Sequence, residues 1–94
     1  MGTSNRVKPE HLPKKLETIR TRLGLKTEEL IGRLACPEVP LYRASISQYE
    51  RGKREPPLLI LLAYARIANV YVDVLIDDTI ELPEQTPAPN KISI

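Results

Sequence analysis

Residues 45–54 read SISQYERGKR and combine hydrogen-bonding side chains with a cluster of cations. The run fits the end of a short helix, because Ile46 and Tyr49 share one face and Gly52 can end a helix. Away from that apolar face the helix would present Ser45, Ser47 and Gln48. Serine, glutamine and arginine can bind base edges in the major groove of DNA, and lysine and arginine can bind phosphates. An ordinary amphipathic helix with a glycine stop explains the same run equally well.

Composition limits the chain to one small domain with no evident catalytic machinery. The 94 residues include no Trp and no Phe, so aliphatic side chains and four Tyr must form the core. Cys36 is the single cysteine, which excludes an intrachain disulfide and favours a reducing, cytoplasmic environment. The sequence contains no nucleophile–base pair, glycine-rich phosphate loop or cluster of metal ligands. We therefore expect no enzyme activity, no metal and no cofactor.

The apolar segments argue against a membrane protein. The longest of them, residues 58–65, is too short to span a bilayer, and the N-terminus lacks the apolar core of a signal peptide. We expect a cytoplasmic protein that makes no membrane contact.

Charge is distributed unevenly along the chain. Residues 1–54 carry twelve Lys/Arg and six Asp/Glu, whereas residues 55–94 carry two Lys/Arg and six Asp/Glu. A basic half beside an acidic half suits a protein that docks one face on a polyanion. A merely solvated surface is the alternative.

Apolar spacing and breakers predict five short helices and no sheet. In the first helix, Leu12, Leu16, Ile19 and Leu23 form the stripe, and Gly24 is the left-handed cap. The solvent-exposed side of this helix should carry Lys14, Lys15, Arg20 and Arg22. Asn69 should cap the fourth helix. The expected helices span residues 12–23, 26–34, 42–51, 56–68 and 72–77.

The predicted organisation is a basic arm at residues 1–9, a helical domain at 10–78 and a proline-containing extended tail at 79–94. An alternative for the tail is docking on the domain or on a partner through Leu82, Ile92 and Ile94. The second and third helices, joined by a short irregular segment, fit a helix-turn-helix.

Together these segments resemble the Cro and phage-repressor type of regulator, the XRE family, over residues 12–77. The resemblance is specific because several motifs agree in order and spacing. They are Leu23-Gly24-Leu25, Thr27-Glu28-Glu29-Leu30, the run at 45–54, Pro56, and Leu61-Leu62 through Ala65, Ala68, Val70, Asp73 and Leu75. The resemblance implies a compact five-helix lambda-repressor-like fold that binds operator DNA as a two-fold dimer, with the third helix in the major groove.

The resemblance also implies which residues contact DNA. Arg43 would pair with guanine, Gln48 with adenine, and Ala44 with a thymine methyl group. The base contacts implied are Arg43, Ala44, Ser45 and Gln48. The phosphate contacts implied are Lys26, Thr27, Ser47, Arg51, Lys53 and Arg54. We expect Glu50 to serve the structure, paired with an arginine.

Three positions depart from the family pattern. Thr27 replaces the glutamine that often opens the second helix, so we expect its side-chain bridge to the third helix to be lost. About five extra residues, at 36–41, separate the two helices, which leaves the start of the third helix open. Tyr71 stands where serine commonly caps the fifth helix.

The last two helices carry more apolar residues than a thin domain can bury. We expect a homodimer formed through Leu59, Ile60, Val74 and Ile76; the alternative is that these residues complete the core.

The favoured function is a sequence-specific transcriptional regulator that binds double-stranded operator DNA, with no small-molecule ligand evident. The alternative is a protein-interaction adaptor or antitoxin-type subunit built on the same fold.

Overall fold

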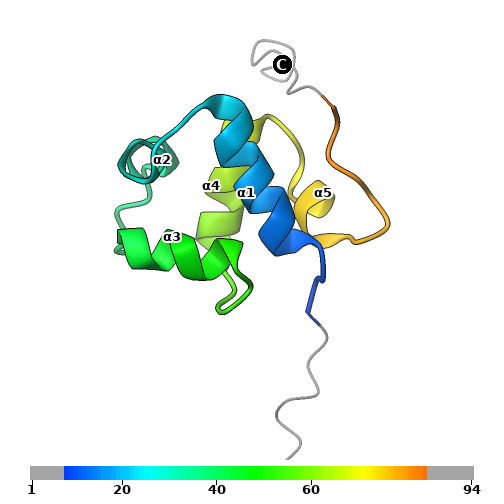
Figure 1. Ribbon diagram of the computed structural model, residues 1–94, viewed down its shortest axis with the longest axis horizontal. Helices are drawn as coiled ribbons and strands as arrows, with labels where there is room; N and C mark the ends of the chain where they lie inside the picture. Colours follow the sequence, from blue (N-terminus) through cyan, green and yellow to red (C-terminus); the bar gives the residue numbers. More distant parts are fainter. Residues whose placement is uncertain (1–7, 85–94) are drawn as a thin grey trace, which may run out of the picture.

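The computed structural model describes residues 8–84, which contain five helices and no strand (Figure 1). The all-helical prediction is thus confirmed, and the helices begin and end close to the predicted positions. They are α1 (Leu12–Leu23), α2 (Thr27–Leu34), α3 (Arg43–Glu50), α4 (Leu58–Ala68) and α5 (Val72–Ile76).

Two helices end as the sequence predicts. Gly24 (φ 68°) and Asn69 (φ 64°) both adopt the left-handed conformation. After each of them the chain folds back: Leu25 N–H donates to Arg20 O at 3.1 Å, and Val70 N–H donates to Ala65 O at 3.0 Å. These bonds satisfy carbonyls that the helix leaves free at its C-terminus, so α1 and α4 stop at defined residues.

The core lies where α1 and α4 cross, with α2 and α3 on one side and α5 on the other (Figure 1). Its largest fully buried side chains come from all five helices. They are Tyr49, Tyr64, Leu16, Leu30, Ile46, Ile60 and Leu75. Among residues 8–84, no helix is long and apolar enough to cross a membrane.

Ile60 corrects the predicted dimer interface, because its side chain is fully buried in this core. Leu58, the first residue of α4, is 82% exposed. The apolar residues of α4 continue almost all round the helix, so no polar face was present to fix which side is buried. The buried residues of α4 are Ile60, Leu61, Ala63, Tyr64, Ala65 and Ala68.

Lys15 is a second correction, since it was expected on the wet side of α1 and is only 6% exposed. Its ammonium group donates to three backbone carbonyls: Val74 O at 2.7 Å, Asp77 O at 3.1 Å and Ile80 O at 2.7 Å. An ammonium group has three protons to donate, so these acceptors can satisfy all of them. Lys15 therefore ties α1 to the end of α5 and to the segment that follows.

Residues 77–83, which we call the strap, run along α1 after α5. The Asp78 carboxylate accepts hydrogen bonds from the N–H groups of Glu10 and His11, at 2.9 and 3.1 Å. At the other end of the strap, Arg22 donates to the Pro83 carbonyl. Leu82 packs against the core, as in the docking alternative for the tail, whereas Ile92 and Ile94 lie outside the described residues.

Candidate nucleic-acid interface

Helix α3 is anchored from behind by the two residues that its spacing suggested. Ile46 and Tyr49 are 1% and 2% exposed, and both belong to the core. Arg43 and Ala44 lie at the exposed start of the helix, and Ser47 and Gln48 are half-buried further along it. The helix thus presents a polar face to solvent while its apolar face is fixed.

Ser45 is the exception, and the prediction that it contacts a base is wrong for this structure. It is only 7% exposed, and its hydroxyl accepts a hydrogen bond from the Tyr42 N–H at 3.2 Å. Tyr42 is the residue that precedes α3, so Ser45 caps the start of the helix. Because of the extra residues at 36–41, the sequence did not define the first residue of α3. It therefore did not show that Ser45 would be the third residue of the helix.

The start of α3 is linked to α2 by an ion pair that was not expected. Arg43 Nε lies 3.2 Å from Glu28 Oε2, and the two side chains are 76% and 61% exposed. We expected Thr27 to make no side-chain bridge from α2 to α3. Glu28, the next residue, makes such a bridge instead. Acids in the first turn of α2 suit the helix dipole, so sequence alone gave Glu28 a local explanation.

The end of α3 is joined to α1 by a closer pair. Arg20 donates to both carboxylate oxygens of Glu50, from Nε at 2.7 Å and from Nη2 at 3.0 Å. These side chains are 26% and 11% exposed, and the bonds raise the pKa of the Arg20 guanidinium above its ordinary value. The expected structural role of Glu50 is confirmed, whereas Arg20 is less exposed than predicted. This pair fixes the orientation of α3 on α1.

A buried hydroxyl lies near this pair. Tyr64 is fully buried, and its hydroxyl has no hydrogen-bond partner among the described residues. Burial, and to a lesser extent the negative charge of Glu50, raise the pKa of the Tyr64 hydroxyl well above its ordinary value. The hydroxyl therefore stays neutral under physiological conditions.

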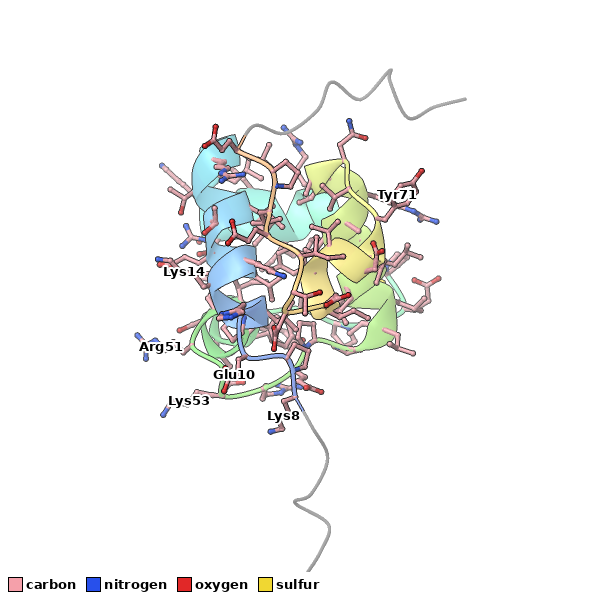
Figure 2. All side chains as sticks on the ribbon, turned by 90° about the vertical axis from the view of Figure 1, so that its right-hand side faces the viewer. Lys8, Glu10, Lys14, Arg51, Lys53 and Tyr71 are labelled. Carbon is pink, nitrogen blue, oxygen red and sulfur yellow. The ribbon has the colours of Figure 1, made fainter. Side chains whose placement is uncertain are left out.

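Beyond α3 the chain turns sharply at Gly52. Its φ of 75° favours glycine, and a Cβ there would lie 3.3 Å from Pro13 Cγ of α1. The Lys53 N–H donates to Gln48 O at 2.9 Å, which closes the end of the helix. Arg51, Lys53 and Lys8 then project from the same edge of the molecule (Figure 2).

Arg54 was also expected to contact a phosphate. Its side chain instead packs against the last turn of α3. Its guanidinium donates to Gln48 Oε1 at 3.3 Å and lies 5.9 Å from the centre of the Tyr49 ring. A cation over an aromatic face is attracted to it, so Arg54 is held next to the proposed adenine-binding amide. Because Gln48 Oε1 accepts from Arg54, the amide nitrogen of Gln48 can donate to another group.

Several expected phosphate contacts gather between α1, α2 and α3. Thr27, Ser47 and Arg51 line one polar hollow of about 310 Å³, together with Glu17 and the Arg20–Glu50 pair. Lys26, which precedes α2, is exposed, and its backbone N–H donates to Glu29 Oε1 at 2.7 Å. The structure thus brings the start of α2 close to the second half of α3.

The extra segment at 36–41 forms a loop that packs against the domain. Val39 N–H donates to Cys36 O at 3.2 Å, and Cys36, Val39 and Leu41 pack against the core. Desolvation and a hydrogen bond to Glu38 raise the pKa of the Cys36 thiol, which disfavours the reactive thiolate. Tyr42, at the end of this loop, is 64% exposed beside Arg43, and sequence reasoning did not include it among the site residues.

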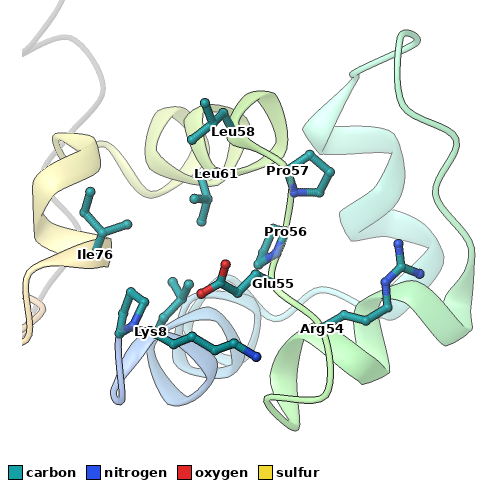
Figure 3. Close-up of a pocket in the computed structure, with 10 residues that line it drawn as sticks. Lys8, Arg54, Glu55, Pro56, Pro57, Leu58, Leu61 and Ile76 are labelled. Atoms are coloured by element: carbon teal, nitrogen blue, oxygen red, sulfur yellow. The ribbon is translucent and has the colours of Figure 1, made fainter. Parts of the chain in front are cut away.

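A second surface, on α4 and α5, is apolar. Leu59 and Ile76 from the predicted interface are 49% and 44% exposed, and Val74 is half-buried. Two further residues missed from sequence, Leu58 and Tyr71, are 82% and 78% exposed. A groove of about 570 Å³ lies beside Leu58 and Ile76 (Figure 3). Charged side chains also line it, namely Lys8, Arg54 and Glu55. We call Leu58, Leu59, Tyr71 and Ile76 the apolar surface.

Neither a metal centre nor a known relative accounts for these surfaces. Within residues 8–84, no three His, Cys, Asp or Glu side chains lie close enough together to hold a metal ion. No protein-family model, no curated protein and no solved structure shows significant similarity to this chain.

Proposed function

We propose that this chain is a sequence-specific regulator of transcription with a lambda-repressor-like helix-turn-helix, in which α3 enters the major groove of DNA. The observation that carries this proposal is the seating of α3. Ile46 and Tyr49 hold the helix from behind, while Arg43, Ala44 and Gln48 face outward. A rigidly held helix with exposed polar residues meets the requirement for reading base edges.

Cations next to α3 support the same assignment. Arg51, Lys53 and Lys8 project from one edge, where they can neutralise phosphates on either side of the groove (Figure 2). Thr27, Ser47 and Arg51 line one hollow at the start of α2, so the hydroxyl groups and the guanidinium proposed to contact phosphates lie close together. The base contacts that remain in the proposal are Arg43 with guanine, Gln48 with adenine and Ala44 with a thymine methyl group.

The apolar surface supports a homodimer as the active form. Exposed leucine, isoleucine and tyrosine side chains on a small domain favour association. A two-fold dimer would present two copies of α3 to successive turns of the major groove, and its operator would be a palindrome. A regulator of this kind would act in the cytoplasm, without a cofactor or small-molecule ligand.

Selection of bound fragments from a random pool of double-stranded DNA tests this proposal. We expect a two-fold symmetric consensus with half-sites about one helical turn apart. Affinity for that consensus should fall steeply with salt, by about 0.9 in log–log slope for each phosphate contact. Recovery of no enriched sequence, from a protein whose helical content is intact, would refute the assignment.

A second candidate function is a protein-interaction adaptor or antitoxin-type subunit, which the groove beside Leu61 and Ile76 favours. Binding through the apolar side chains Leu58, Leu61 and Ile76 should depend far less on salt than binding to DNA. The salt dependence of the partner complex therefore separates the two functions.

A further inference from the structure

We infer that Glu28 is a selectivity residue: it positions Arg43 for guanine and penalises binding to sites that lack this base. The inference rests on the proposed function, because it assigns a role to a side chain beside the DNA-reading helix. It concerns the ion pair between the first turn of α2 and the first residue of α3, in which Arg43 Nε lies 3.2 Å from Glu28 Oε2.

This pair contributes little to the fold. Its side chains are 61% and 76% exposed, and exposed ion pairs contribute little to stability because water and salt screen them. The orientation of α3 is already fixed by the half-buried Arg20–Glu50 pair and by the core residues behind it. The position of Glu28 therefore has more bearing on what Arg43 contacts than on whether the domain folds.

The geometry of the contact leaves the recognition end of Arg43 available. Glu28 approaches Nε, whereas the two terminal nitrogens of a guanidinium are those that pair with O6 and N7 of guanine. A long arginine side chain loses rotamer entropy when it is fixed. A carboxylate that restricts Arg43 before binding reduces the part of this loss that falls on complex formation.

The charge of Glu28 acts in the opposite direction at incorrect sites. Where no guanine is present, Arg43 gains most by turning to a phosphate, which breaks the pair and leaves an exposed carboxylate facing the DNA polyanion. Like charges at an interface disfavour the complex. Discrimination then comes from a repulsive element as well as from an attractive one.

The test compares Glu28→Gln with the wild-type chain on two duplexes. One duplex is the consensus from the random-pool selection, and the other has the guanine opposite Arg43 replaced by adenine. We expect the variant to bind the altered duplex about three- to five-fold more tightly and the consensus with little change, so the affinity ratio falls by about the same factor. Fluorescence anisotropy at one fixed salt concentration measures all four affinities.

Two controls separate positioning from general charge. Glu81→Gln removes the same charge from the strap, where the side chain is exposed, and should leave the ratio unchanged. In an Arg43→Ala background, Glu28→Gln should change both affinities by the same factor, because no guanidinium is left to position. Urea unfolding of each variant checks that stability changes by less than the binding effects.

The outcomes distinguish this inference from the proposed function. A wild-type chain that shows no preference between the duplexes contradicts the function itself. A wild-type chain that discriminates, and a Glu28→Gln variant that keeps the full ratio, contradicts only the role of Glu28. A fall in the ratio that persists without Arg43 likewise overturns the role, because the carboxylate would then act on DNA alone.

Discussion

The two ends of α3 are each joined to another helix by an arginine–carboxylate pair, and the two pairs differ in burial and geometry. At the end of the helix, Arg20 grips both oxygens of Glu50, and the side chains are 26% and 11% exposed. At its start, Arg43 meets one oxygen of Glu28, and both side chains are mostly in solvent.

The difference separates a structural pair from one available for the proposed recognition of DNA within one short helix. A bidentate, half-buried pair resists exchange, because both carboxylate oxygens already have a donor and both charged groups have lost part of their hydration. An exposed single contact can be exchanged for another partner at little cost. Charged residues of the same types therefore serve the fold at one end of α3 and remain available for a ligand at the other.

The largest effect should come from breaking the half-buried pair. Glu50→Ala leaves the Arg20 guanidinium without its two acceptors, and we expect the free energy of unfolding to fall by about 2–3 kcal/mol. Urea denaturation measures this loss. A double-mutant cycle with Arg20→Ala should return a coupling energy above 1 kcal/mol, and coupling near zero would remove the contrast between the two pairs.

The exposed pair should behave in the opposite way. Arg43→Ala should change the free energy of unfolding by less than about 0.5 kcal/mol and weaken operator binding by about 1–3 kcal/mol. Arg43→Lys keeps the charge but loses the planar fork, so it should restore little of the specific binding. Loss of stability comparable to that of Glu50→Ala would show that both pairs are structural.

A smaller effect is expected at Tyr64, whose buried hydroxyl lies near the Arg20–Glu50 pair. Tyr64→Phe removes a polar atom that has no partner within residues 8–84, so stability at neutral pH should rise by up to about 1 kcal/mol. The raised pKa of Tyr64 gives a stability contribution that is complete below about pH 10 and is lost as pH rises above it. Urea unfolding at pH 8 and pH 10.5 should therefore show a smaller alkaline loss for the variant than for wild type.

The smallest effect on stability is expected from Asp78, which binds the backbone just before the N-terminus of α1. Backbone N–H groups of Glu10 and His11 bind the Asp78 carboxylate and lower its pKa below the ordinary value. A lowered pKa stabilises the fold above about pH 4, and this contribution disappears as pH falls through the lowered value. Asp78→Asn should thus flatten the acid side of the stability profile. An acid side that stays as steep in Asp78→Asn as in wild type would contradict this contribution.

Local signals accounted for the helices and for the anchoring of α3. Gly24, Asn69 and the prolines fix helix limits through their own backbone preferences, which depend on no distant contact. The three-residue spacing of Ile46 and Tyr49 identified the buried side of α3 for the same reason. Five helices and their approximate ends could therefore be predicted from the sequence.

The wrong predictions concern burial. They occur where a contact, rather than local apolar spacing, determines whether a side chain is buried, or where the helix has no polar face. Lys15 is buried because carbonyls about sixty residues later surround it, which no local periodicity reveals. Ser45 lies one helical turn before the buried Tyr49, and its hydroxyl accepts from the Tyr42 N–H at the start of α3, a contact that apolar spacing does not reveal. Ile60 lies on a helix that is apolar nearly all round, so its spacing could not separate a core position from an interface position.

The carbonyl shell around Lys15 sets a limit on how far the chain can be shortened. One of its three oxygens belongs to Ile80, two residues beyond the end of the expected helical domain. Truncation after Asp78 would leave that ammonium one acceptor short in a site with almost no access to water. A minimal fragment for spectroscopy or crystallisation should for this reason extend at least to Ile80, so that the lysine keeps all three carbonyl acceptors.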